Sequence, residues 1–215
     1  MTNGTKGMVH TVDSQRNSGQ RPSRPFRWVA LAVLGLSGVL ASCSNSSSPD
    51  ESGASALTPE DVSVWFERIA DVMHPCDSAS RETSASLEVF AARSDGIDHD
   101  LTVVLDAGNG VEQCSLSSGV GLTPDQIADV PTGMKPLVDV SARWMTSMES
   151  ANLAILIATA DNLDNRVIVG EAFDKQADAN AVADEFDAVL AKLMGEVGLT
   201  LPEDVQLHRW EVDVQ

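Results

Sequence analysis

The sequence predicts a mainly α-helical fold: a bundle of about four helices tied by one disulfide, with an extended C-terminal tail. Three observations predict it. Apolar residues recur every three or four positions over long stretches. Helix-starting residues precede several of these stretches. The same region also holds the two cysteines that we expect to form the disulfide, Cys76 and Cys114. The 215 residues suffice for one domain with a real core, and no internal repeat is evident.

The first predicted helix opens at residues 58–61, where Thr-Pro-Glu-Asp supplies a capping hydroxyl, a proline at the first position and acids in the first turn. Apolar residues follow at helical spacing: Val62, Trp65, Phe66, Ile69 and Met73. Pro75 is expected to end this helix, because proline lacks the N–H that the helix ladder needs. A second helix is then expected to open after residue 77 or 78 and to carry Leu87, Phe90 and Ala91.

The middle of the chain is harder to interpret. Residues 101–105 (Leu-Thr-Val-Val-Leu) suit a buried strand as well as a helix. The Gly-Asn-Gly sequence at 108–110 indicates a turn. Residues 115–133 are rich in glycine and proline, so we expect a loop there, with a short helical turn beginning at residues 123–125 (Thr-Pro-Asp).

Pro136 is expected to open the longest helix. Its apolar positions form a seam suited to a bundle: Leu137, Val140, Trp144, Met148, Ala151, Ile155, Ala158 and Leu163. The rival interpretation makes residues 153–158 and 166–169 a β-hairpin, and we favour the helix because the seam continues through Ala158 and alanine is a strong helix former. Residues 166–170 suit a short strand or an extended connection.

The last predicted helix spans about residues 174–194, with Gly195 as its stop. The tail alternates apolar and polar residues with one phase slip, which suggests a strand with a bulge or an extended arm packed on the bundle. Trp210 decides the tail's role: if exposed it indicates a contact surface, and if buried it holds the tail to the bundle.

The first 42 residues have the composition of a secretory signal peptide. Five basic residues and one acidic residue precede a run of about 14 uncharged apolar residues at 28–41. A helix that crosses a bilayer needs roughly 20 residues, so this run is short for an uncleaved anchor.

The end of the leader, Leu40-Ala41-Ser42-Cys43, resembles the lipobox of bacterial lipoproteins. The resemblance implies a thioether-linked diacylglycerol on Cys43, with fatty acyl chains such as palmitate, and cleavage just before it. It therefore implies a signal peptide at 1–42 and a protein held at the cell membrane, facing outside the cytoplasm. Composition then predicts a flexible Ser-rich linker at 43–57, which would carry the lipid, and an acidic helical domain at 58–215.

The number of cysteines agrees with lipidation. The chain has three cysteines, and an odd number in an exported protein needs an explanation. Lipidation uses Cys43, and oxidising conditions outside the cytoplasm favour a disulfide between Cys76 and Cys114. Closing this loop contributes roughly 4 kcal/mol in the chain-entropy model. The alternative is two free buried thiols.

Charge and composition exclude several functions. Without residues 1–42 the chain keeps 9 Lys and Arg against 31 Asp and Glu, a net charge of −22 that disfavours nucleic acids and anionic lipid surfaces. The three histidines beyond the leader are His74, His99 and His208; they form no ligand-spaced pair, so we predict no metal site and no cofactor. Signatures of nucleophilic or phosphate-binding sites are also missing from the sequence.

These observations favour a non-enzymatic binding or protein-interaction module. Its partner would be another envelope protein or a small apolar or cationic ligand. Trp144, Met145 and Met148 are candidates for lining a groove, because thioethers adapt to varied shapes, although core packing is the favoured explanation of all three. The alternative function is a hydrolase that acts on cell-envelope polymers.

Overall fold

The computed structural model describes residues 57–91, 101–119, 121–160, 166–201 and 205–211. By its internal contacts the chain divides into two units, residues 1–45 and 46–215, and all described residues belong to the second unit. The predicted leader, the lipidation residue Cys43, most of the linker and the cluster around His99 lie outside the described residues.

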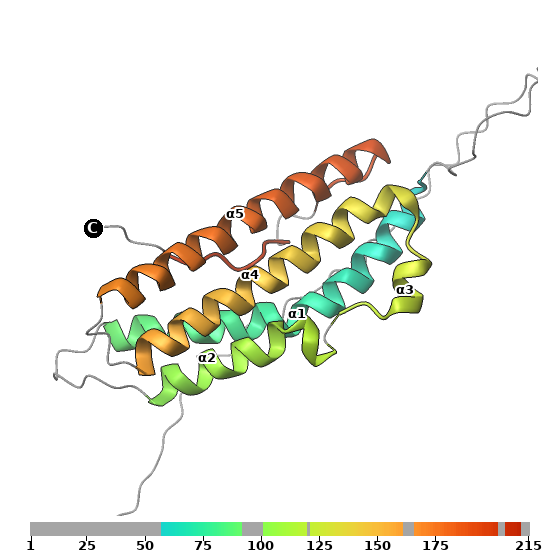
Figure 1. Ribbon diagram of the computed structural model, residues 1–215. Helices are drawn as coiled ribbons and strands as arrows, with labels where there is room; N and C mark the ends of the chain where they lie inside the picture. Colours follow the sequence, from blue (N-terminus) through green and yellow to red (C-terminus); the bar gives the residue numbers. More distant parts are fainter. Residues whose placement is uncertain (1–56, 92–100, 120, 161–165, 202–204, 212–215) are drawn as a thin grey trace, which may run out of the picture. The chain divides into compact units, whose positions relative to one another are not determined.

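The described part of the chain is helical and contains no strand, which confirms the predicted fold class (Figure 1). Its helices are α1 (Pro59–Ala91), α2 (Leu101–Cys114), α3 (Pro124–Ala128), α4 (Lys135–Ala160) and α5 (Arg166–Glu196), with short 3-10 turns at Leu116–Ser118 and Thr132–Met134. None of the described helices is both long enough and apolar enough to span a membrane.

Helix α1 corrects the expectation that Pro75 ends the first helix. It continues through Pro75 for 33 residues in all, so the two predicted helices are one. Buried residues lie on both sides of the proline, Met73 before it and Cys76 and Ala79 after it. Proline removes one hydrogen bond of the ladder, and the burial on both sides favours continuation over a break.

Helix α2 corrects the turn expected at residues 108–110. The glycines lie inside the helix, and the ambiguous residues 101–105 form its first turn. Gly110 is buried against α4: a Cβ atom built there would lie 2.4 Å from Cγ of Asn152. The glycine is therefore a site of close helix approach rather than a turn.

The connection from α2 to α4 contains the short helix predicted from Thr123. The Thr123 hydroxyl accepts a hydrogen bond from the Gln126 N–H at 3.3 Å, and Oε1 of Gln126 accepts one from the Thr123 N–H at 2.8 Å. This reciprocal pairing is a capping box, and it confirms the helical turn expected there.

Helices α4 and α5 settle the question of helix or hairpin in favour of helices. Residues 153–158 are helical in α4, and residues 166–170 form the start of α5 rather than a strand. At 26 residues α4 is shorter than α1 and α5, so it is not the longest helix.

Helix α5 passes Gly195 and ends before Gly198, whose φ of 73° is left-handed. There the Leu199 N–H bonds to the Met194 carbonyl at 2.8 Å.

Helix α4 is the centre of the bundle. It packs against α1, α2 and α5, whereas α1 and α5 make little direct contact with each other. The tail, residues 205–211, is neither helix nor strand, and it runs back along α5 in the opposite direction (Figure 1). Its Trp210 is only 4% exposed and belongs to the main core cluster, so the tail is an extended arm packed on the bundle.

Candidate functional site

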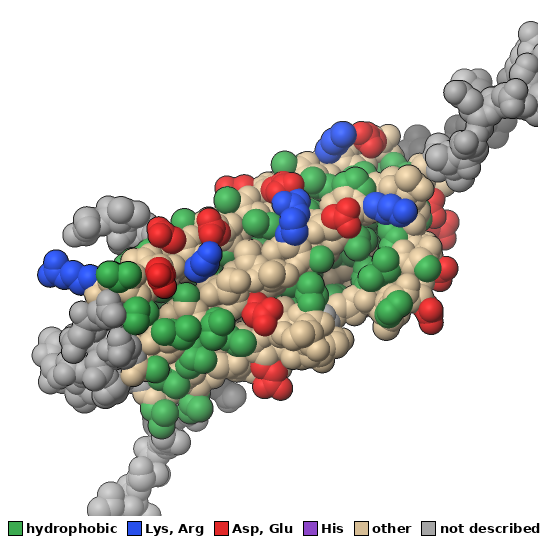
Figure 2. All heavy atoms as spheres, in the orientation of Figure 1, with side chains coloured by type: hydrophobic (Ala, Val, Ile, Leu, Met, Phe, Trp, Pro, Cys, Tyr) green, Lys and Arg blue, Asp and Glu red, His purple; other side chains and the backbone are tan. Residues whose placement is uncertain are grey.

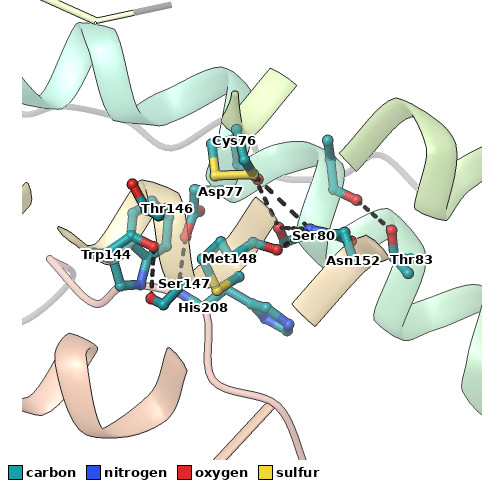
Figure 3. Close-up of a disulfide and its surroundings, with 12 residues drawn as sticks. Cys76, Asp77, Ser80, Thr83, Trp144, Thr146, Ser147, Met148, Asn152 and His208 are labelled. Atoms are coloured by element: carbon teal, nitrogen blue, oxygen red, sulfur yellow. Dashed lines mark hydrogen bonds between the residues drawn. A yellow bond between two sulfur atoms is a disulfide. The ribbon is translucent and has the colours of Figure 1, made fainter. Parts of the chain in front are cut away.

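The predicted disulfide joins Cys76 of α1 to Cys114 at the end of α2, which confirms the pairing. Both cysteines are completely buried. Asn152 of α4 lies beside them: its Nδ2 donates to Ser80 Oγ at 3.0 Å and to the Met148 carbonyl at 2.9 Å (Figure 3). The bridge and this polar cluster together connect α1, α2 and α4, so the disulfide is a structural tie without access to solvent.

The three residues proposed for a ligand groove lie in the core. Trp144, Met145 and Met148 are 0%, 1% and 0% exposed, because the apolar seam of α4 faces the neighbouring helices. Trp144 and Met148 therefore do not line an open groove, which corrects that interpretation. Met145 does form part of the wall of a hollow of about 230 Å³, together with Ile69 and Leu122.

The C-terminal tail is held against α1 through its main chain. The carboxylate of Asp77 accepts a hydrogen bond from the His208 N–H at 2.7 Å, and Nη2 of Arg81 donates to the Gln206 carbonyl at 2.9 Å. Arg81 also pairs with Asp77 at 2.7 Å, which orients both side chains. Figure 3 shows His208 beside Asp77, on the side of α4 that carries Trp144 and Met148.

Helix α5 holds the other side of the tail. The Asn180 side chain accepts a hydrogen bond from the Trp210 N–H at 2.8 Å and donates one to the Trp210 carbonyl at 2.9 Å. Arg209 pairs with Asp184 at 2.9 Å and with Asp187 at 2.5 Å. The tail thus bridges the two helices that barely contact each other.

Burial lowers the pKa of His208 to about 4, and the positive charge of Arg81 acts in the same direction. Asp77 favours the protonated ring and Arg209 disfavours it, with smaller effects. His208 is 7% exposed, and its ring contacts the Trp210 ring edge-on, with centroids 4.9 Å apart. His208 is therefore neutral at physiological pH.

The surface between α4 and α5 carries two adjoining hollows that share Ser150 and Lys175. One, of about 390 Å³, is lined mainly by polar residues such as Arg143 and Asp178. The other, of about 560 Å³, lies toward the end of α4, and charged residues such as Glu171 and Lys175 share its lining with apolar ones. Its apolar residues are Leu153, Ala154, Ile157 and Ile168.

Hydrophobic side chains gather at the end of the bundle where α2 begins and α4 ends (Figure 2). Five large hydrophobic residues from the adjoining helix ends are between 44% and 70% exposed: Leu101, Leu105, Leu153, Ile157 and Val167. We call these five residues the apolar end. Large exposed apolar groups that cluster in this way are typical of interaction surfaces.

Two other groups of ionisable side chains with shifted pKa values lie in an ion pair and in a helix cap. Arg143 of α4 and Glu185 of α5 form a two-point ion pair, at 2.7 and 2.6 Å, which lowers the pKa of Glu185 and raises that of Arg143. The Thr58 cap lowers the pKa of Asp61. Within the described ranges, His, Cys, Asp and Glu form no group of three or more able to hold a metal ion, and His74 is exposed on α1.

The residues that hold the tail were not predicted from the sequence. Asp77 and His208 are separated by 131 positions, so no local spacing connects them.

Comparisons with protein-family models, with curated proteins and with solved structures found no match for this chain.

Proposed function

We propose that this protein is a membrane-anchored lipoprotein of the cell envelope whose helical domain is a non-enzymatic binding or interaction module. The observation that carries the proposal is the cysteine pairing. Because Cys76 and Cys114 are joined, Cys43 is the remaining cysteine of three, and it stands at the lipobox-like sequence Leu40-Ala41-Ser42-Cys43.

The physical chemistry of such an anchor fits the rest of the chain. Each buried methylene of an acyl chain contributes about 0.8 kcal/mol, and two chains suffice for stable attachment. The net charge of −22 beyond residue 42 repels anionic lipid surfaces. Attachment would therefore depend on the lipid, and the Ser-rich stretch that follows Cys43 would separate the domain from the bilayer by about 20 Å on average.

The binding role is supported by the surface of the domain. The apolar end and the adjoining hollow of about 560 Å³ offer contact area for a partner protein or a small ligand. The described groups with shifted pKa values belong to a helix cap, a surface ion pair and the held tail, which are structural positions. These features favour binding over catalysis.

The anchoring proposal is tested by substituting the lipidation residue. Cys43→Ala in the full-length chain should move the protein from the membrane fraction to the soluble or secreted fraction, while Ser44→Ala, its matched control, should remain in the membrane fraction. Mass spectrometry of the wild-type protein should find acyl groups on Cys43. A membrane fraction unchanged by Cys43→Ala contradicts the anchor.

The binding role is tested separately. The soluble domain, used as bait in envelope extract, should retain a defined partner or ligand. Release of soluble fragments from purified envelope polymer by the same domain would instead support the hydrolase.

A further inference from the structure

The C-terminal tail occupies a groove between α1 and α5. These two helices both pack on α4 but make little contact with each other, and residues 205–211 lie between them in an extended conformation. Val205 and Leu207 of the tail pack against the core from this groove, and Trp210 is buried in it. The groove is therefore a site that already holds an extended peptide, namely the chain's own.

The groove contacts this peptide through main-chain atoms at alternate residues. Arg81 donates to the carbonyl of Gln206, Asp77 accepts the N–H of His208, and Asn180 pairs with both the N–H and the carbonyl of Trp210. Alternate residues of an extended chain face the same side. Because every peptide carries these main-chain groups, the contacts do not depend on the sequence of the tail.

The side-chain contacts define which peptides would fit best. Trp210 fills a buried position, and Arg209 before it is paired with the acidic residues Asp184 and Asp187 of α5. The groove thus favours a basic residue followed by an aromatic one.

The chain's own tail is an imperfect occupant. Nε2 of His208 and Nε1 of Trp210 are buried without a hydrogen-bond partner among the described residues. A buried polar atom without a partner is unfavourable. A peptide that places an apolar ring at either position would avoid this penalty and compete with the tail.

We propose that the α1–α5 groove is a binding site for an extended segment of a partner protein, with a basic–aromatic pair, and that the C-terminal tail occupies it when the partner is absent. The inference deepens the proposed binding role and rests on it. It does not depend on the lipid anchor. The anchor is tested by the membrane fraction of the Cys43→Ala variant, and that measurement does not involve the groove.

The test measures whether the groove accepts the peptide from solution. A fluorescent peptide of residues 203–215 is titrated with the full-length chain in detergent, and binding is read by anisotropy. The tethered tail competes at an effective concentration near millimolar, so binding to the wild type should be weak. Trp210→Ala in the chain weakens the tail and leaves the groove intact, so it should tighten peptide binding at least ten-fold.

Further variants assign the binding to the groove. Adding Asn180→Ala to the Trp210→Ala chain should weaken peptide binding at least ten-fold, and a peptide with Phe in place of Trp210 should bind at least as well as the original. Glu211→Ala, an exposed change on the tail, is the matched control and should resemble the wild type. If Trp210→Ala loses its helical circular dichroism signal, Arg209→Ala takes its place.

Three results would overturn the proposal. The first is no saturable binding by a folded Trp210→Ala or Arg209→Ala chain, which would make the tail a permanent part of the core. The second is binding that Asn180→Ala leaves unchanged, since the peptide would then bind elsewhere. The third is a wild-type dimer with exchanged tails, detected by size exclusion and crosslinking, which would make a second copy the occupant.

Discussion

Acidification should destabilise the domain through His208. Its pKa is about 4 in the folded domain against 6.5 for an ordinary histidine. Between these values the unfolded chain binds more protons, so the stabilisation is complete above about pH 6.5 and is lost as the pH falls toward 4. This difference between the two pKa values corresponds to about 3 kcal/mol in the free energy of unfolding, of which about 2 kcal/mol should be lost by pH 5. Urea denaturation of the domain at residues 58–215 between pH 4 and pH 8 measures this loss.

The variant that removes this titration is His208→Phe. Phenylalanine at 208 keeps a ring against Trp210 but does not titrate, so the loss of stability between pH 6.5 and pH 5 should shrink by about 2 kcal/mol relative to wild type. Parallel profiles for wild type and His208→Phe would refute the reasoning.

Two further predictions concern the helix contacts around the bridge. Gly110→Ala should lower the free energy of unfolding by about 1–3 kcal/mol, because the added Cβ would collide with Asn152. Its control, Gly108→Ala, has nothing within 4 Å of the added Cβ and should raise the free energy of unfolding by about 0.5–1 kcal/mol. Equal free energies for the two variants in urea denaturation would contradict the close approach of Gly110 and Asn152. Replacing Cys76 and Cys114 together by Ala should lower the free energy of unfolding by about 2–5 kcal/mol. In the wild type both thiols should react with alkylating reagents only after reduction under denaturing conditions, and alkylation of Cys76 or Cys114 in the native, unreduced protein would contradict the bridge.

The sequence predicted the features that depend on local chemistry. The caps at Thr58 and Thr123 and the apolar seam of α4 each lie within a few residues of their partners, and all three are present in the structure. The disulfide was predicted for a different reason: with Cys43 assigned to lipidation, only one pairing remained.

The errors came from local signals that tertiary contacts override. Pro75 and the glycines of α2 weaken a helix taken alone. In the folded chain, buried residues on both sides of Pro75 keep α1 continuous, and the close approach of Asn152 requires a residue without a side chain at position 110. The same glycine that indicates a turn in isolation is needed here for packing between helices.

The contacts that join the helices indicate which part of the bundle could release its own segment and bind another. Helices α1, α2 and α4 are joined by the disulfide and the buried Asn152 cluster, which water does not reach. The α1–α5 side is closed instead by the tail, through a few hydrogen bonds, the ion pairs of Arg209 and the burial of Trp210. Local opening occurs first where fewer buried contacts must break. Release of the tail would therefore expose the groove while the covalently tied helices remain folded, as a reversible peptide-binding site requires.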